Sequence, residues 1–448
     1  MLALSALAGC RLGTAIGPDQ SIRDPSTFRE RASWTLLVYM CADNELEGYA
    51  LADINEMETA MPRMIGVNVV VLCDRAPGYD TSNGDWTCTR LYEVTADPEI
   101  GSALIASKRV GSVQLGLSAA GDEELDLGDP AVLGGFVAFG KEAYPADHYA
   151  LIIWGHGTGW RGAQAELDSA LERAAVRAPA GSRAAGLDES DGEDLLFTYE
   201  IGRALAGQGL EVIGFDTCSA AMLELAYQLR SAGTYMVGSE DIVQADGFRY
   251  GDLLERFSHS PQDADGLVDA IIASYADAQC DASGSTISAV RLSSIGAVMS
   301  ALNALSDALW SATTTAAMQS ALRRAIFEDV EAFYATPGDL NVDLADLADV
   351  VSERFGVAGM EAAALRSSVL DAVSAEWHHP SGHPRAHGLA VHYVPLASDG
   401  TAISHDAAYF RGAPVANSLS FVQDSTWVPC YPGGPGLLYR LWYERFDP

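Results

Sequence analysis

The sequence predicts an α/β fold in which helices flank a mostly parallel sheet. Short apolar runs rich in β-branched and aromatic residues alternate with segments of helical spacing, which is typical of βαβ units. Hydrophobic residues make up 48% and charged residues 20% of the 448 positions, so the chain can bury a large core. Two of the apolar runs lead into short loops that carry a His and a Cys, and such loops carry function in open α/β sheets.

The first half of the chain supplies most of the expected sheet. Apolar residues recur at helical spacing after the first strand, and Asp43 or Asn44 can cap that helix. Pro130 suits the first turn of the next helix. We expect strands at 34–41, 67–74, 86–94, 149–157, 211–220 and 234–240, and helices at 42–61, 130–144, 198–207 and 220–233.

The second half is interpreted as a helical extension with a small β element. We expect a strand at 286–292, helices to about residue 375, a His/Pro loop at 377–387, a strand at 388–395 and a turn-rich tail beyond 400. The expected division is a leader at 1–32, a core at 33–260 and a C-terminal part at 261–448. Residues 161–184 break the alternation of strands and helices. We expect them to form a surface linker between two elements of the 33–260 unit.

The charge balance excludes one large class of partner. The chain has 27 Lys and Arg against 61 Asp and Glu, a formal net charge of −34. Nucleic-acid binding rests on basic residues that neutralise phosphates, so nucleic acid is not expected as a partner. The same charge disfavours attachment to anionic lipid and attracts basic peptide segments. No apolar run reaches about 18 residues, so we expect no transmembrane helix.

The N-terminus indicates export. Leu7-Ala8-Gly9-Cys10 resembles a bacterial lipobox, in which the cysteine is lipidated and becomes the mature N-terminus. The alternative is a chance apolar N-terminus. We expect an exported protein at the cell envelope, or a secreted one, that meets the membrane only through a lipidated Cys10.

His156 and Cys218 are the candidates for nucleophilic catalysis. Each follows a predicted strand, and a thiolate nucleophile needs an imidazole to move protons. The N–H groups of Gly157 and Cys218 could hold an oxyanion. The expected helix at 220–233 would place its N-terminus at Cys218 and lower the pKa of the thiol. The alternatives are a structural histidine and a buried, inert thiol.

The chain resembles the clostripain family of cysteine peptidases, which have a caspase-like fold. The resemblance covers about 33–395 and rests on WTLLVYMCADNELEGYALADINEME, HYALIIWGHGTGW and EVIGFDTCSAAMLELAYQLRSAGTYMVGSEDIVQADGF. It implies that Cys218 is the nucleophile and His156 the general acid and base. It also implies that Asp216 selects Arg or Lys before the scissile bond. The alternative for Asp216 is a helix N-cap.

The resemblance further implies self-cleavage and a response to calcium. Arg173, Arg177 and Arg183 are possible self-cleavage sites, unless they form i, i+4 pairs on a solvated helix. The chemistry itself requires no cofactor. Ca²⁺ is implied by the resemblance alone, because no EF-hand loop is present and the sequence names no ligands. Thr217 departs from the family's usual small residue, and Asp246 is either a second pocket acid or, as we favour, a turn residue.

The remaining histidines and cysteines give weaker signals. A histidine cluster is expected to form a loop with exposed imidazoles rather than a metal site, because Pro384 opposes a helix there. The cluster comprises His378, His379, His383, His387 and His392. A Cys280–Cys430 disulfide is the most plausible pairing, although sequence does not fix connectivity.

Taken with the resemblance, these features predict an exported cysteine endopeptidase that cleaves after Arg or Lys in protein and peptide substrates. One alternative is a catalytically silent surface lipoprotein that uses the same fold as a binding module. The other is a caspase-like protease of different specificity.

Overall fold

The computed structural model describes residues 29–99, 102–157, 184–190, 194–336 and 339–393, together with 421, 424–427, 430–431, 434–435 and 437. Cys10, Arg173, Arg177, Arg183, most of the leader and most of the tail lie outside the described residues.

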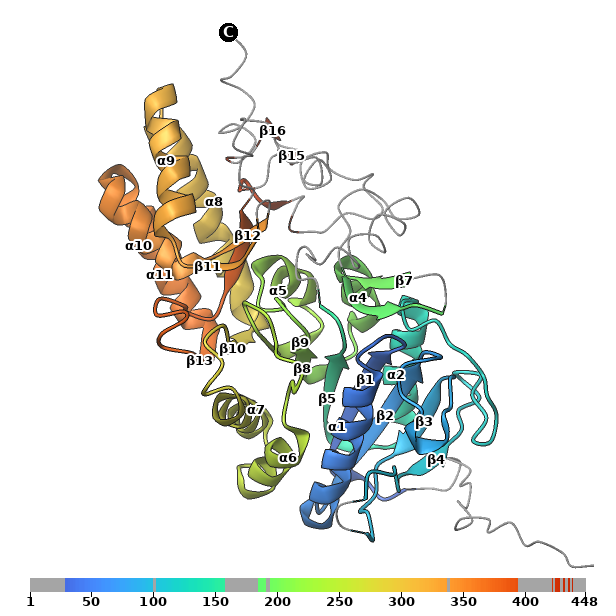
Figure 1. Ribbon diagram of the computed structural model, residues 1–448. Coiled ribbons are helices and arrows are strands. Elements are labelled where there is room, and N and C mark those ends of the chain that lie inside the picture. Colours follow the sequence, from blue (N-terminus) through green and yellow to red (C-terminus); the bar gives the residue numbers. More distant parts are fainter. Residues whose placement is uncertain are drawn as a thin grey trace, which may run out of the picture.

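A nine-stranded sheet forms the centre of the described chain (Figure 1), in the order β13-β10-β9-β8-β5-β1-β2-β3-β4. The five central strands pair in parallel; they are β9, β8, β5, β1 and β2. At each end of the sheet two further strands join antiparallel: β10 and β13 beyond β9, and β3 and β4 beyond β2. The predicted mostly parallel sheet is therefore confirmed. The strands are β1 (Ala32–Ala42), β2 (Val67–Arg75), β3 (Arg90–Glu93), β4 (Lys108–Val110), β5 (Ala146–Trp154), β8 (Leu210–Asp216), β9 (Gly233–Gly238), β10 (Thr286–Arg291) and β13 (Val373–His378).

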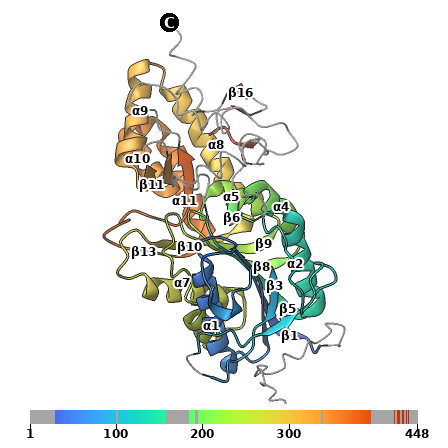
Figure 2. The ribbon, with the colours of Figure 1, turned by 45° about the vertical axis from the view of Figure 1, so that its right-hand side comes forward.

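Helices cover both faces of this sheet (Figure 2). Side chains of β1 alternate between two cores: Leu37 and Tyr39 enter one, and Leu36 and Val38 enter the other. Burial on both faces explains why such strands are near-continuous apolar runs in the sequence. One face is covered by α1 (Glu47–Ala60), α6 (Tyr250–His259) and α7 (Ala264–Ala278), the other by α2 (Pro130–Ala143), α4 (Thr198–Leu205) and α5 (Leu223–Leu229).

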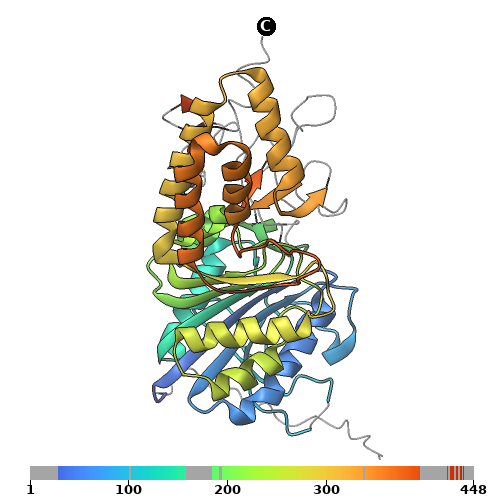
Figure 3. The same ribbon diagram turned by 90° about the vertical axis from the view of Figure 1, so that its left-hand side faces the viewer.

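The C-terminal part extends the second of these layers (Figure 3). Its helices are α8 (Ile295–Ala312), α9 (Ala316–Asp329), α10 (Leu344–Arg354) and α11 (Gly359–Ala372), and its three-stranded sheet has the order β11 (Ala332–Thr336), β12 (Asp339–Asp343), β14 (Ala390–Tyr393). In the described part of the chain, the segment Leu292–Ala312 alone is long and apolar enough to cross a membrane. Its residues Val298, Leu302 and Leu305 are fully buried in the protein core, as in a soluble protein's core helix.

Several elements differ from the sequence-based expectation. The β11–β12 hairpin interrupts a region expected to be helical, and β13 replaces the start of the expected His/Pro loop. The expected cap of α1 by Asp43 or Asn44 is wrong, because the N-cap position is Leu46, whose N–H donates to the Asn44 side chain. The smaller elements are the hairpin β6 (Ala184–Asp188) and β7 (Asp194–Phe197), the pair β15 (Cys430–Tyr431) and β16 (Gly434–Pro435), and the 3-10 turns η1 (Met61–Arg63), η2 (Ser82–Gly84), η3 (Leu292–Ser294) and η4 (Gly356–Ala358).

The predicted disulfide is also wrong. Cys280 is an exposed free thiol, so it does not pair with Cys430. Cys41, Cys73 and Cys88 are buried free thiols, the first two in the apolar strands β1 and β2.

Candidate active site

The sheet register brings the two predicted catalytic loops together. β5 pairs in parallel with β8, and Trp154 of β5 lies opposite Asp216 of β8. His156 and Cys218 each follow two residues beyond these paired positions, at the carboxyl edge of the sheet. Gly157 touches the second loop, because a Cβ placed on it would lie 2.5 Å from the Cys218 carbonyl oxygen and 2.7 Å from the Cys218 nitrogen. Only a residue without a side chain allows this approach.

The backbone on either side of the two residues is conformationally restricted. Gly155 has φ +138°, and a Cβ on it would lie 2.8 Å from the carbonyl oxygen of Cys41. Ser219, directly after Cys218, has φ +51°, a left-handed conformation that costs a non-glycine residue free energy. Its N–H donates to the Asp241 carbonyl at 2.9 Å, which holds the strained turn in place.

Cys218 is a protonated thiol in this conformation. Burial raises the pKa of its thiol to about 11, and the Val243 N–H donates to its sulfur at 3.4 Å. α5 begins at Leu223 and not at the cysteine. The predicted lowering of the thiol pKa by a helix N-terminus is therefore wrong, because no helix begins at Cys218 and desolvation dominates.

The imidazole of His156 has an acidic partner that the sequence analysis missed. Its Nε2 lies 3.0 Å from Oε1 of Glu45, and this hydrogen bond lowers the pKa of the Glu45 carboxyl. Glu45 stands in the loop that follows β1, the strand beside β5. That position was the only available signal, because 111 residues separate the pair. Among the described residues, no hydrogen bond joins His156 to Cys218 directly.

Asp216 ends β8 as a buried carboxyl. It accepts hydrogen bonds from the N–H of Phe248 at 3.0 Å and from the Tyr250 hydroxyl at 3.1 Å. It does not cap α5; it ties the segment before α6 to the end of β8. Gly247, at φ +50°, lets that segment approach, since a Cβ there would lie 2.7 Å from the carboxylate. Burial raises the pKa of Asp216 to about 7, although the hydrogen bonds oppose the shift.

Two further acids lie near Asp216: Asp53, whose pKa is affected by the charge of Asp216, and Asp246, the residue before Gly247. Asp53 accepts a hydrogen bond from Trp154 Nε1 at 2.8 Å, and burial followed by the charge of Asp216 raises its pKa well above the usual range. Asp246 is exposed in the turn before Gly247. The interpretation of Asp246 as a turn residue fits this placement.

The histidine cluster does not form the expected exposed loop. His383 and His392 are buried, and the other three are partly buried. His383 lies between two carboxylates, 2.9 Å from Asp241 and 3.2 Å from Glu331. Burial opposes its charge, but these hydrogen bonds raise its pKa to about 9. Both ring nitrogens are thus engaged by acids, which leaves no free nitrogen to bind a metal.

Carboxylates with the spacing of metal ligands lie elsewhere. Within the described residues, Asp43, Asp74 and Glu124 place one oxygen each within 4.8 Å of the others. None of these was singled out as a metal ligand from the sequence.

Comparisons with known proteins give one consistent result. The model of the clostripain family matches residues 38–374. Clostripain from Hathewaya histolytica is 31% identical over 249 residues, which cover 53% of this chain. The chain aligns with 44% of the length of that relative, so less than half of clostripain is matched.

Two solved structures share the fold over most of this chain. The first is an inactive zymogen C11 protease from Parabacteroides distasonis, with a TM-score of 0.58 and 18% identity, covering 82% of this chain and 93% of that chain. The second is a secreted C11 cysteine protease from Bacteroides thetaiotaomicron in complex with an irreversible peptide inhibitor. Its TM-score is 0.59 at 16% identity, and the match covers 88% of this chain and 99% of that chain. The predicted α/β/α fold is therefore confirmed.

Proposed function

This chain belongs to the clostripain family, and we propose that it is a cysteine endopeptidase that hydrolyses peptide bonds after Arg or Lys, with Cys218 as nucleophile and His156 as general acid and base. The observation that carries the proposal is the pairing of β5 with β8. It sets both residues two positions beyond neighbouring strand ends, with Gly157 packed on the backbone of Cys218.

The proposed reaction begins with a proton transfer. Because the pKa of the buried thiol is about 11, Cys218 becomes a nucleophile only when His156 takes its proton. The imidazole therefore has to turn from Glu45 toward the sulfur when substrate binds. The thiolate attacks the scissile carbonyl, and the N–H groups of Gly157 and Cys218 stabilise the oxyanion. His156 then protonates the leaving amine and activates the water that hydrolyses the thioester.

The preference for a basic residue rests on Asp216. It lies two residues before the nucleophile, and a buried carboxylate favours a guanidinium that it can bind through two hydrogen bonds. In the present conformation this carboxylate accepts hydrogen bonds from the Phe248 N–H and the Tyr250 hydroxyl. The segment before α6 has to open for the substrate side chain to reach it. The net charge of −34 supports the same preference by attracting basic substrates.

Three finer proposals accompany this one. We propose that the protein cleaves itself at Arg173, Arg177 or Arg183, within the segment that connects β5 to β6. We also propose export and a lipid anchor at Cys10. A relative of the same fold from Bacteroides thetaiotaomicron is described as secreted, which supports export. The peptide chemistry requires no cofactor, because the thiol and the imidazole supply nucleophile and proton carrier.

The test is a cleavage profile on a library of fluorogenic peptides that vary the residue before the scissile bond. Arg and Lys peptides should be cleaved, and Cys218→Ala should abolish cleavage while the circular dichroism spectrum stays unchanged. Cys280→Ala is the matched control, since it removes an exposed free thiol outside the site. Activity that survives in Cys218→Ala would refute the assignment of the nucleophile. A folded parent protein that cleaves no library peptide would favour the silent binding module.

A further inference from the structure

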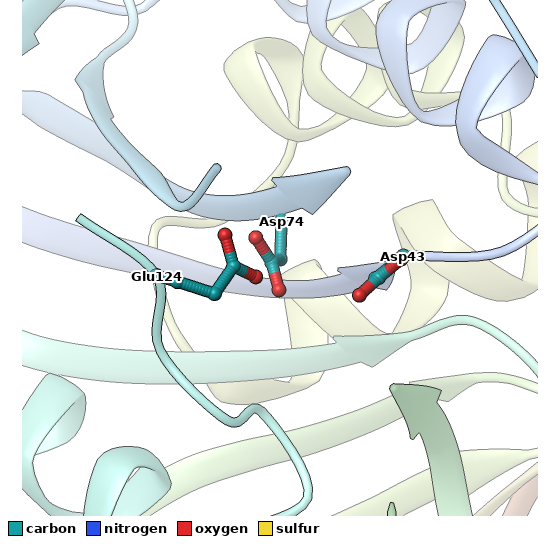
Figure 4. Close-up of side chains that lie close together, drawn as sticks. All are labelled: Asp43, Asp74 and Glu124. Atoms are coloured by element: carbon teal, nitrogen blue, oxygen red, sulfur yellow. The ribbon is translucent and has the colours of Figure 1, made fainter. Parts of the chain in front are cut away.

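Three carboxyl groups from different parts of the chain meet beside the carboxyl ends of β1 and β2 (Figure 4). Asp43 directly follows β1, Asp74 is the second-last residue of β2, and Glu124 lies in the segment before α2. Figure 4 shows their carboxyl groups turned toward one another. Asp43 and Asp74 are 1% and 0% exposed, whereas Glu124 is exposed, so the group has a buried floor and one side open to solvent.

Each of the two buried carboxylates has one oxygen bound and one oxygen without a partner. Oδ2 of Asp43 accepts from the Ser190 N–H at 2.9 Å, and Oδ1 of Asp74 accepts from the Thr89 hydroxyl at 3.0 Å. Asp43 Oδ1 and Asp74 Oδ2 are buried with no hydrogen-bond partner. Within the described residues, neither acid pairs with a Lys, Arg or His side chain. Buried charge left uncompensated in this way is costly.

A proton shared between Asp74 and Glu124 would leave one buried oxygen of the group, on Asp43, without a partner. Burial, and next to it the charge of Glu124, raises the pKa of Asp74 well above its usual range, so a proton can neutralise that pair. The free oxygen of Asp43 would still face it without a donor. A cation bound by all three carboxylates satisfies both orphaned oxygens at once.

We propose that Asp43, Asp74 and Glu124 bind a hard divalent cation, and that their chemistry selects Ca²⁺. All three offer oxygen, which suits Ca²⁺ and Mg²⁺ and not the softer metals that prefer imidazole or thiolate. Ca²⁺ accepts several protein carboxylates in irregular geometry, whereas Mg²⁺ demands a near-ideal octahedron and keeps most of its waters. The open side at Glu124 leaves room for the water ligands that complete the Ca²⁺ coordination.

The site joins segments that lead to the candidate active site. From Asp43 the chain runs two residues to Glu45, which contacts His156. Ser190, bound to Asp43, belongs to the loop between β6 and β7. A bound cation therefore stiffens the loop that holds the catalytic imidazole and fastens the β6–β7 hairpin to the sheet. The binding site itself does not depend on the proposed peptidase function.

The experiment uses the full chain as Cys218→Ala, which prevents self-cleavage, after removal of metal with EDTA. Calorimetric titration with CaCl₂ should show saturable binding to one site, and thermal unfolding should shift to higher temperature with CaCl₂. MgCl₂ should bind at least about tenfold more weakly. Adding Asp43→Asn or Glu124→Gln should weaken Ca²⁺ binding at least about tenfold, since each removes a charged ligand. Glu123→Gln is the matched control, because it removes the adjacent charge, which binds Ser118 instead.

The outcomes separate the proposal from a purely structural role. Ca²⁺ affinity that is unchanged in Asp43→Asn and Glu124→Gln, or absent in the parent, would overturn the site. Binding of Mg²⁺ as tight as that of Ca²⁺ would overturn the choice of metal. In EDTA, Asp74→Asn should unfold at the same denaturant concentration as the parent or a higher one, because it relieves repulsion among the acids; with CaCl₂ the order should reverse. Should a buried variant fail to fold, the exposed Glu124→Gln alone decides the result.

Discussion

Adding one methyl group to Gly157 should disable the enzyme with little effect on the rest of the fold. In Gly157→Ala the new Cβ would lie 2.5 Å from the Cys218 carbonyl oxygen, whereas ordinary contacts begin at 3.4 Å. The two loops therefore have to separate by about 0.9 Å. A displacement of about 1 Å at reacting groups can cost about 10²-fold in rate, or about 2.7 kcal/mol of transition-state stabilisation.

The assay is kcat/KM on a fluorogenic Arg peptide, with thermal unfolding measured in parallel. Gly296→Ala is the matched control, because a Cβ at that position in α8 meets no atom within 4 Å. It should keep the parental rate and unfold at the same temperature or slightly higher, since Ala favours a helix over Gly. If Gly157→Ala retained the parental kcat/KM, the packing of Gly157 on the nucleophile loop would not govern catalysis, and the oxyanion role of its N–H would lose its support.

Three further predictions concern acids and a histidine around the site. Asp216 has a folded pKa of about 7, above its unfolded value, so burying its carboxyl destabilises the fold. This destabilisation grows as pH rises from about 4 to 7. Asp216→Asn should therefore raise the free energy of unfolding at pH 8 by roughly 2–4 kcal/mol, leave it unchanged at pH 4, and abolish the preference for Arg and Lys peptides. His383, with a folded pKa of about 9, stabilises the fold below pH 6.5 and loses this effect toward pH 9. Urea unfolding should therefore show His383→Gln to be less stable than the parent at pH 6 by roughly 2–3 kcal/mol and nearly equal to it above pH 9; a constant difference would contradict the ion pairs. Glu45→Gln should raise kcat/KM by up to about tenfold without changing the unfolding temperature, because the His156 imidazole has to leave the Glu45 carboxylate before it can take the proton of Cys218; a lowered or unchanged rate would contradict this step.

The parts of the fold that could be predicted are those whose signal is local. β1, β2, β5 and β8 are buried on both faces, so each is a continuous apolar run that no amphipathic helix would produce. His156 and Cys218 could be placed at one edge because parallel strands align their carboxyl ends. The structure sets their loops in contact through Gly157.

The missed features depend on contacts between distant segments. β13 is only partly buried, so its side chains show no apolar alternation, and its strand form comes from pairing with β10. The pairing of His156 with Glu45 depends on β1 lying beside β5, an arrangement that spacing along the chain does not give. The thiol pKa of Cys218 is mispredicted for the same reason: the helix expected at 220–233 begins three residues later, at Leu223, and the burial of the sulfur is a tertiary property.

The position of β1 also has a consequence for how the chain folds. β1 is made early but lies between β2 and β5, and its pairing with β5 joins Ala32 to Ala146. A nascent chain that ends before β5 therefore exposes a long apolar strand edge, the kind of edge that aggregates. At about 5–20 residues per second, synthesis needs several seconds to supply the missing neighbour. Completion of the sheet is thus late and non-local, so we expect slow folding and a need for chaperone protection of β1 until β5 arrives.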